Sequence, residues 1–260
     1  MNLEEIKKHW EDAGKYFSDE GKVTPTSRDP FLALLEKENI MSYLERSHRV
    51  LELGCGDASH TIQYARKVEK LLAIDIAQTL VDRAKQRLAQ ESISNVELTV
   101  GSILELDRIY RAQNFDCILS QRCLINLPEW SYQRKTILQV RDLLAEGGLF
   151  LLTEGFQEEY DQLNAVRKHF GLDIINTNYN RSLVRREFED FIAPYFNILE
   201  VRDYGAYLFF SRVLHPLAVY PRAPKHDAAI NEAAMRVARE VTLPDFKAYS
   251  FNLFYALKKK

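Results

Sequence analysis

The middle of the chain alternates between short apolar runs and amphipathic stretches. Short apolar runs are typical of buried strands, and apolar positions at helical spacing predict helices between them. We expect strands at 50–53, 71–74, 96–100, 115–119 and 149–153, and helices at 59–68, 78–90 and 131–144. The Gly147-Gly148 pair is expected to stop the last helix. Strands that alternate with helices form right-handed βαβ units, which predicts a parallel sheet covered on both faces.

The two ends of the chain follow a different pattern. Leu3, Ile6, Trp10 and Phe17 have helical spacing within residues 1–20, and 31–44 are again amphipathic. They predict an N-terminal helical lid over 1–47, followed by an α/β domain over 48–260. In that domain we expect a closing strand pair at 198–201 and 251–256. Accessory substrate-binding insertions are expected near 158–195 and 212–248, with helices at 158–170, 185–195 and 227–240.

Composition and charge narrow the class of protein. The chain has 260 residues, of which 46% are hydrophobic and 28% charged, as in ordinary globular proteins. A net charge of −2 supplies no broad positive field, so we expect no nucleic-acid partner. Because the N-terminus is charged and no apolar run approaches ~20 residues, we expect neither a signal peptide nor a membrane partner.

Cysteine and histidine usage adds two expectations. Cys55, Cys117 and Cys123 have no C-x-x-C spacing, which favours reduced thiols and a cytoplasmic location. The six histidines are scattered along the chain without ligand spacing, so we expect no metal site.

The turn after the first predicted strand is the strongest chemical signal. Glu52 precedes a Gly54-x-Gly56 turn, whose glycines let the backbone approach a ligand closely, and Asp75 ends the next strand. An ordinary βα turn and a dinucleotide-binding oxidoreductase are the alternatives. A dinucleotide-binding site favours a third glycine at the position where this chain has Ser59. In addition, Glu52 and Asp57 would repel a pyrophosphate.

The segment Glu52-Leu53-Gly54-Cys55-Gly56-Asp57 resembles the first motif of class I S-adenosylmethionine-dependent methyltransferases of the small-molecule type. Segments 73–76, 115–118 and 143–148 resemble that family's second strand end, fourth strand and approach to the fifth strand, in the same order. The resemblance implies a Rossmann-like α/β fold with a seven-stranded, mostly parallel sheet, an antiparallel last strand and helical accessory segments. It also implies S-adenosylmethionine as the cofactor.

Cofactor contacts are implied at Glu52, Gly54, Cys55, Gly56, Asp75, Ile76, Ser102, Ile103 and Ser120. Glu52 would meet the ammonium of the cofactor, Asp75 the ribose, and Ile76 would lie beside the adenine. Ser102 stands where the family often has an acidic residue that contacts the adenine amino group. Ala58 replaces the usual third glycine, and we expect a helix start to tolerate its methyl group.

The methyl acceptor is less constrained by the sequence. No Asn/Asp-Pro-Pro-Tyr/Phe segment follows the fourth strand, which argues against acceptors such as flipped adenine. We expect O-methylation of an anionic or sugar- or polyketide-type metabolite. The alternatives are N-methylation of a small amine and a non-catalytic scaffold, and a monomer and a homodimer are both compatible.

The residues proposed to act on the acceptor fall into two groups. Substrate-binding candidates are Arg122, Asn126, Tyr179, Arg181, Tyr207 and Arg212, because interleaved aromatic and guanidinium groups suit an anionic molecule. Structural salt bridges are the alternative for Arg181 and Arg212. Catalytic candidates are Glu154, Gln121 and Arg122, and Glu154 could instead cap a turn.

Overall fold

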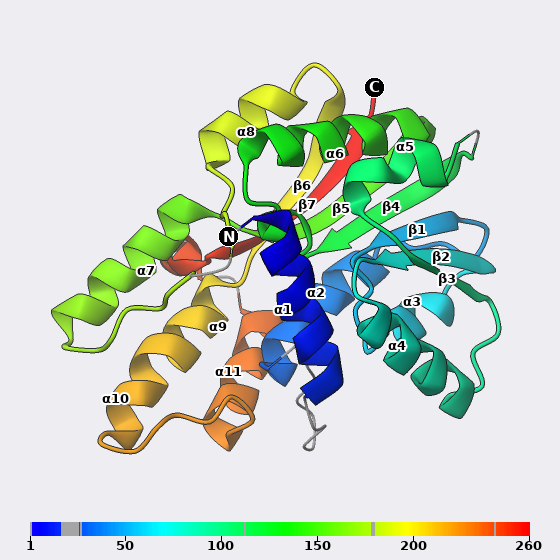
Figure 1. Ribbon diagram of the computed structural model, residues 1–260. Coiled ribbons are helices and arrows are strands. Elements are labelled where there is room, and N and C mark those ends of the chain that lie inside the picture. The colour runs from blue at the N-terminus through cyan, green and yellow to red at the C-terminus, as the bar shows by residue number, and fades with distance from the viewer. Residues whose placement is uncertain (1, 17–25, 27, 112, 178–179, 242) are drawn as a thin grey trace.

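A seven-stranded sheet with the order β3-β2-β1-β4-β5-β7-β6 forms the centre of the computed structural model (Figure 1). The structure describes residues 2–16, 26, 28–111, 113–177, 180–241 and 243–260. Strands β3, β2, β1, β4 and β5 pair in parallel, and β7 runs antiparallel to both β5 and β6. The Rossmann-like α/β fold is therefore confirmed. The strands are β1 (Arg49–Leu53), β2 (Lys70–Asp75), β3 (Val96–Val100), β4 (Phe115–Gln121), β5 (Leu144–Gly155), β6 (Phe196–Asp203) and β7 (Asn252–Lys259).

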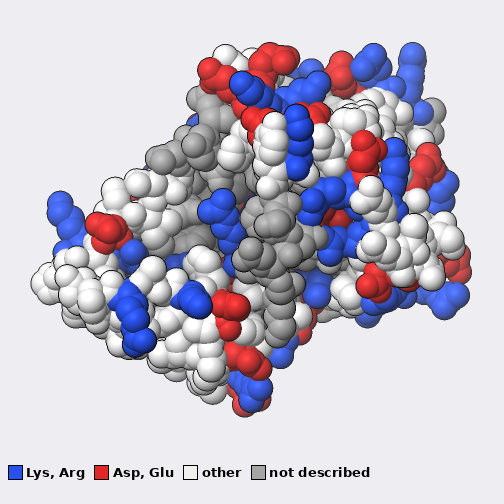
Figure 2. Space-filling model, turned by 60° about the horizontal axis from the view of Figure 1, so that its bottom comes forward, with Lys and Arg blue, Asp and Glu red and all other residues white. Residues whose placement is uncertain are grey.

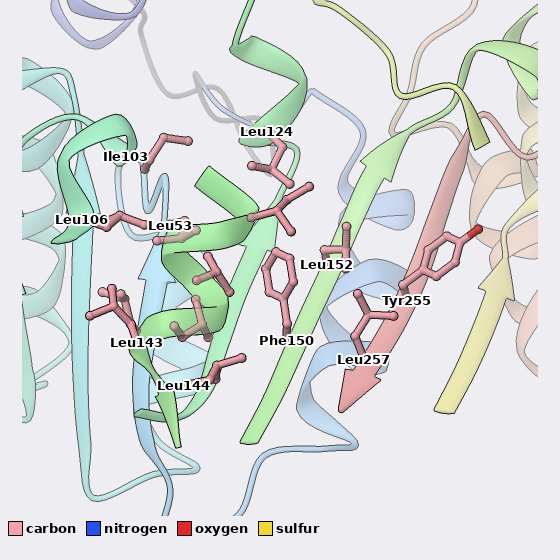
Figure 3. Close-up of a cluster of buried hydrophobic side chains, with 14 of the residues drawn as sticks. Leu53, Ile103, Leu106, Leu124, Leu143, Leu144, Phe150, Leu152, Tyr255 and Leu257 are labelled. Carbon is pink, nitrogen blue, oxygen red and sulfur yellow. The ribbon is translucent and has the colours of Figure 1, made fainter. Parts of the chain in front are cut away.

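Alternating side chains of the strands pack against helices on the two faces of the sheet. Leu53, Phe150 and Leu257 join a core with Leu106 and Leu143 (Figure 3). This core lies beneath α5 (Leu106–Ile109), α6 (Trp130–Leu143) and α8 (Arg185–Ile192). The opposite face is covered by α2 (Pro30–Met41), α3 (Thr61–Ala65) and α4 (Gln78–Gln90). Since the side-chain period of a strand is two, Glu52 lies on the second face, between the core residues Leu51 and Leu53 of the first.

Helix α4 and strand β3 have the predicted bounds, whereas the ends of most other elements differ, and two of these differences have a clear cause. Helix α3 begins only at Thr61, because the preceding Ala58 has a left-handed φ of 62° and cannot start a helix. The expectation that Gly147-Gly148 stops α6 is wrong. Helix α6 ends at Leu143, Leu144 already pairs with Phe115, and the glycines lie inside β5 at an irregularity of the ladder.

Most of the remaining helices pack with α2 into the core of the second face of the sheet (Figure 1). They are α7 (Gln157–His169), α9 (Gly205–Phe209), the π-helical turn η3 (Phe210–Leu214), α10 (His215–Val219), α11 (Ala229–Glu240) and the 3₁₀ turn η4 (Pro244–Tyr249). Helices over 205–219 were not predicted. Gly205 and Pro216 are typical of loops, yet Gly205 packs against the carbonyl of Phe246 and Pro216 occupies the first turn of α10, where proline is tolerated.

The outer surface shows mixed charge. On the face in Figure 2, Lys and Arg are interspersed with Asp and Glu. Among the helices that the structure describes, none is long and apolar enough to cross a membrane.

Helix α1 (Leu3–Tyr16) is docked on α4 by one side chain. Ala77, the N-cap of α4, has no side-chain acceptor, and the Glu11 carboxylate replaces it by accepting from the backbone N–H groups of Gln78 and Thr79 at 2.9 and 3.0 Å. Gly14 allows the close approach, because a Cβ there would lie 2.5 Å from Thr79 Oγ1. Residue Phe17 of the predicted lid lies outside the described residues.

We expect Glu11→Ala to destabilise the protein by about 1 kcal/mol, because it leaves two N–H groups of α4 without their cap. Thermal unfolding should show a Tm lower by roughly 2–4 °C. Asp12→Ala removes an exposed acidic side chain from the same helix and is the control. Equal Tm values for the two variants would mean that Glu11 does not dock the helix.

Candidate functional site

A pocket opens at the carboxyl ends of β1, β2 and β4, where the strand order of the sheet reverses. This position is the usual ligand site of an open α/β sheet. Leu3, Ile6 and Trp10 of α1 form one wall, which the sequence did not reveal as part of a site. Of the predicted residues, the pocket brings together Gly54, Gly56, Asp75, Ile76, Ser102, Ile103, Gln121, Arg122 and Asn126.

Left-handed backbone conformations shape the turn that forms the pocket floor. Gly54 and Gly56 have φ values of 72° and 54°, and a Cβ on Gly54 would lie 2.5 Å from Cys123 Sγ. Ala58 shares this conformation and is completely buried. A left-handed φ costs a residue with a Cβ about 1–2 kcal/mol, so the methyl group there stores strain. The methyl group was expected to lie at a helix start, but the turn continues through Ala58 and the helix begins only at Thr61.

Asp75 ties the loop after β2 to this turn. Its Oδ2 accepts from the Gly56 N–H at 2.8 Å, and its Oδ1 accepts from the Ala77 N–H at 2.9 Å. Burial raises the pKa of Asp75 to about 6, although these N–H groups act in the opposite direction. The carboxylate is only 8% exposed, but it lines the pocket.

Glu52 is a second buried carboxylate behind the turn. Its Oε2 atom accepts no hydrogen bond from the residues that the structure describes. Burial raises the pKa of Glu52 to about 7, and the Asp75 charge adds to this rise while the Thr61 hydroxyl opposes it. A carboxylate held in this way is stabilised by any cation that reaches it.

Glu154 and Ser120 lie together beneath the pocket and do not line it. Ser120 Oγ donates to Glu154 at 2.6 Å, and the backbone N–H groups of Cys123, Leu124 and Ile125 donate to the same carboxylate at 3.1–3.2 Å. The fully buried Glu154 side chain thus caps the turn after β4. This is the alternative to a catalytic role that the sequence analysis considered for it. Burial raises the pKa of Glu154 to about 7.

Gln121 is the centre of a polar network on the other side of that turn. Its amide oxygen accepts from Tyr64 Oη at 2.8 Å and lies 2.9 Å from His60 Nδ1, while its amide nitrogen donates to Glu36 at 2.9 Å. Burial and the Arg122 charge lower the pKa of His60 to about 3, so its ring is neutral. Because the amide oxygen only accepts, Nδ1 carries the proton and Nε2 is left as an acceptor.

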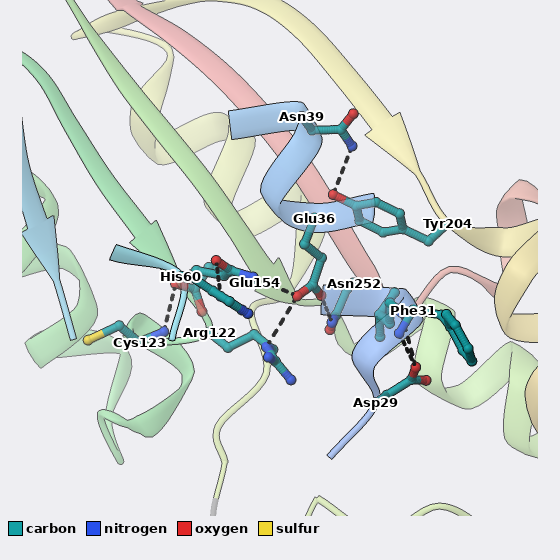
Figure 4. Close-up of polar contacts among 12 residues, drawn as sticks. Asp29, Phe31, Glu36, Asn39, His60, Arg122, Cys123, Glu154, Tyr204 and Asn252 are labelled. Carbon is teal, nitrogen blue, oxygen red and sulfur yellow. Dashed lines mark hydrogen bonds and ion pairs between the residues drawn. The ribbon is translucent and has the colours of Figure 1, made fainter. Parts of the chain in front are cut away.

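Arg122 connects this network to the pocket. Its Nε lies 3.5 Å from Glu36 Oε2, and the residue has a left-handed φ of 55° (Figure 4). Asn252 also donates to Glu36, at 2.6 Å. A role of Glu36 in the site was not predicted from the sequence, because Glu36 is 85 positions away from Gln121 and lies on an apolar helix. Asn126 lines the pocket and donates to the Arg122 carbonyl at 2.7 Å.

Three other predicted substrate residues lie outside this pocket. Arg181 donates to Gln133 at 2.7 Å and pairs with Glu187 at 3.5 Å. Tyr207 and Arg212 both bind the carboxylate of Asp29, which caps α2. Arg181 and Arg212 thus form structural ion pairs, which were the alternative to a role in substrate binding. Cys55 is buried beside the pocket, and Tyr179 lies outside the described residues.

Comparison with known proteins agrees with this geometry. A family model described as a methyltransferase domain matches residues 44–184, more than half of the chain. Protein-L-isoaspartate O-methyltransferase 2 of Rhodopseudomonas palustris (strain HaA2) is 32% identical over 104 residues, which cover 40% of this chain and 46% of that protein. The chain thus spans about half the length of the curated relatives it matches.

Two solved structures share the fold along nearly the whole chain. N-methyltransferase NodS from Bradyrhizobium japonicum WM9, in complex with S-adenosyl-L-homocysteine, has a TM-score of 0.60 at 15% identity and 98% coverage of both chains. Magnesium protoporphyrin IX methyltransferase (ChlM) from Synechocystis PCC 6803 has a TM-score of 0.65 at 10% identity and 100% coverage of both.

The fold of the chain is therefore the Rossmann-like fold that these two methyltransferases share. The chain belongs to the methyltransferase-domain family.

We expect Gly54→Ala to abolish S-adenosylmethionine binding, because the new methyl group would displace Cys123 from the pocket wall. Gly171→Ala is the matched control, since Gly171 has a similar φ of 70° but no atom within 4 Å of the added carbon. Both variants should lose about 1 kcal/mol of stability from backbone strain. Isothermal titration calorimetry and thermal unfolding measure the two effects, and wild-type affinity in Gly54→Ala would refute the close approach.

Proposed function

We propose that this chain transfers a methyl group from S-adenosylmethionine to the oxygen of a small anionic molecule. The observation that supports this most is the buried pair Glu52 and Asp75 around the Gly54–Gly56 turn. A pyrophosphate would be repelled by these carboxylates. A cofactor with a cationic amino-acid end and ribose hydroxyl donors would instead satisfy both of them.

Each part of the cofactor has a suitable partner in the proposed arrangement. Glu52 would compensate the ammonium group, directly or through water, and Asp75 would accept the ribose hydroxyls. Ile76 and Ile103 supply apolar surface for the adenine. Ser102 caps the next turn by accepting from the Leu104 N–H at 3.2 Å, so its own hydroxyl proton remains available for the adenine.

The acceptor would lie against Gln121 and Arg122. When bound, the cofactor would supply an electrophilic methyl group: the acceptor oxygen would form the new C–O bond, the electron pair of the broken S–C bond would stay on sulfur, and the hydroxyl proton would be released to solvent. In such a displacement the protein positions the two reactants and excludes water from the site. The Arg122 guanidinium suits an anionic acceptor, whereas the nearby Glu36 carboxylate already accepts hydrogen bonds from Gln121 and Asn252.

The domain organisation fits the same proposal. The N-terminal segment 1–47, which contains α1 and α2, would form a lid that excludes water from the pocket. The segments near 158–195 and 212–248 would contribute to binding of the methyl acceptor. We further propose a cytoplasmic protein that works as a monomer or homodimer without nucleic acid.

Cofactor affinity should depend on pH, because Glu52 and Asp75 must be ionised to match a cation. We expect S-adenosylmethionine to bind about tenfold more tightly at pH 8 than at pH 5.5, measured by calorimetry, as groups with pKa values near 7 and 6 lose their protons. The contribution of these carboxylates to the stability of the unliganded protein should show the opposite trend. Because the pKa values of Glu52 and Asp75 are raised, these two groups bind more protons in the folded state than in the unfolded chain between about pH 4 and pH 7, so their contribution to stability falls as the pH rises through that range. The lowered pKa of His60 acts in the opposite direction over part of this range.

Glu52→Gln is the matched variant, because it keeps the shape of the side chain and removes its titration. It should flatten the pH dependence of the affinity above pH 6. A wild-type affinity that does not change with pH would contradict the proposed role of the two carboxylates.

Formation of S-adenosylhomocysteine with a panel of small acceptors tests the activity itself. We expect turnover of hydroxyl compounds that carry a carboxylate or phosphate. Turnover of amines alone would overturn the oxygen acceptor in favour of N-methylation. A folded protein that binds no S-adenosylmethionine would instead be a scaffold.

A further inference from the structure

A second cavity lies among the accessory helices and shares no lining residue with the pocket at the sheet edge. Helix α7, turn η3, helix α10 and the segment that leads into α11 surround it (Figure 1). Its polar lining consists mainly of basic side chains: Arg167, Arg212, His215, Lys225 and His226.

Cationic groups outnumber carboxylates around this cavity. Arg212 is only 12% exposed and pairs with the buried Asp29. Arg167 donates to the backbone carbonyl of Arg212 and to the backbone carbonyl of Asp173 at 2.8 Å, and both arginine side chains line the cavity. Within the described part of the chain, no carboxylate lies within ion-pairing distance of Arg167 or Lys225. No ion pair with a described residue therefore neutralises these two positive charges.

The electrostatic effects on neighbouring groups agree with an excess of positive charge. Burial and the Arg212 charge lower the pKa of Arg167, against a smaller opposing effect of Asp173. Burial, Arg212, Arg28 and His215 lower the pKa of His226, and only Asp29 opposes them. The charged forms of Arg167 and His226 are thus disfavoured by the nearby cations, and an anion placed among these groups would be attracted by all of them.

His215 provides an independent sign of a ligand. The side chain lines the cavity and is 97% buried, given its 3% exposure, yet its Nδ1 atom has no hydrogen-bond partner among the described residues. A buried polar nitrogen without a partner is costly unless something binds to it. Asn231 keeps the basic segment in place by donating to the carbonyls of Lys225 and His226 at 3.2 and 3.0 Å.

We propose that this cavity is a binding site for a phosphate group. Two guanidinium groups, an ammonium and a buried imidazole offer more donors than the two oxygens of a carboxylate can use, and they match a tetrahedral dianion. The site is separate from the proposed transfer of a methyl group and does not depend on it.

One aromatic layer separates the phosphate site from the methyl-acceptor side. Phe251 lines the cavity and stacks on Tyr160, with ring centroids 4.4 Å apart. Burial raises the pKa of Tyr160 to about 12, while Arg122 and Arg212 both lower it, so this ring lies within reach of both sites. The phosphate has two possible sources: a free ion, or an ester on the acceptor itself.

Calorimetry with inorganic phosphate, at an ionic strength held constant with sodium chloride, tests the proposal. We expect the wild type to bind phosphate and Lys225→Glu to weaken binding at least about tenfold, since a charge within the site is reversed. Lys67→Glu reverses an exposed charge far from the cavity and should bind as the wild type does. Arg167→Gln is a second variant and should also lose affinity. Thermal unfolding, measured on every variant, reports that each one is folded.

A phosphate monoester that carries a free hydroxyl distinguishes the two sources. Tighter binding of glycerol phosphate than of inorganic phosphate, enhanced by S-adenosylmethionine, would place the phosphate on the acceptor. Equal binding of both compounds would identify a free ion. Absence of phosphate binding to the wild type, or binding that survives both Lys225→Glu and Arg167→Gln, would overturn the proposal whatever the outcome of the methyl-transfer assays.

Discussion

The site depends on one buried carboxylate that joins two loops. The Asp75 carboxylate accepts hydrogen bonds from the backbone N–H groups of Gly56 and Ala77. These bonds connect the turn after β1 to the loop after β2 and fix their relative positions. The ladder between β1 and β2 brings the two strand ends together, and the left-handed glycines allow the turn to reach the carboxylate. The cost is that a carboxylate is buried beside a second one, Glu52. A cationic cofactor with hydroxyl donors offsets this cost, which is why the pocket suits S-adenosylmethionine better than an anionic nucleotide.

Segments from distant parts of the chain complete the pocket around this constraint. Glu11 caps α4 and so places the apolar side chains of α1 in the wall of the pocket. Glu36, from α2, orders Gln121 and Arg122 at the mouth. The same carboxylate acts through the Gln121 amide to fix the tautomer of the neutral His60 ring.

The sequence predicted the parts of the structure that local patterns control. The strands β1 to β4, helix α4 and the glycine turn follow from periodicity and from residue types with special backbone freedom, and Asp75 follows from its position at a strand end. The network around Glu36 could not be predicted, because it joins residues 85 apart through contacts that only the packed fold creates. Arg181 and Arg212 illustrate the same limit. Their type suits an anion, but ion pairs with Glu187 and Asp29 depend on tertiary positions that no local pattern shows. Gly147-Gly148 failed as a helix stop because pairing of Leu144 with β4 overrides the local signal.

A crystal structure with bound S-adenosylhomocysteine tests the central claim most directly. We expect the ribose hydroxyls within hydrogen-bonding distance of Asp75, the amino-acid end over the Gly54–Gly56 turn towards Glu52, and Trp10 of α1 against the bound molecule. Electron density for the ligand at another place, or a ribose that leaves Asp75 bonded only to backbone N–H groups, would contradict the claim that this buried carboxylate is the core of the cofactor site.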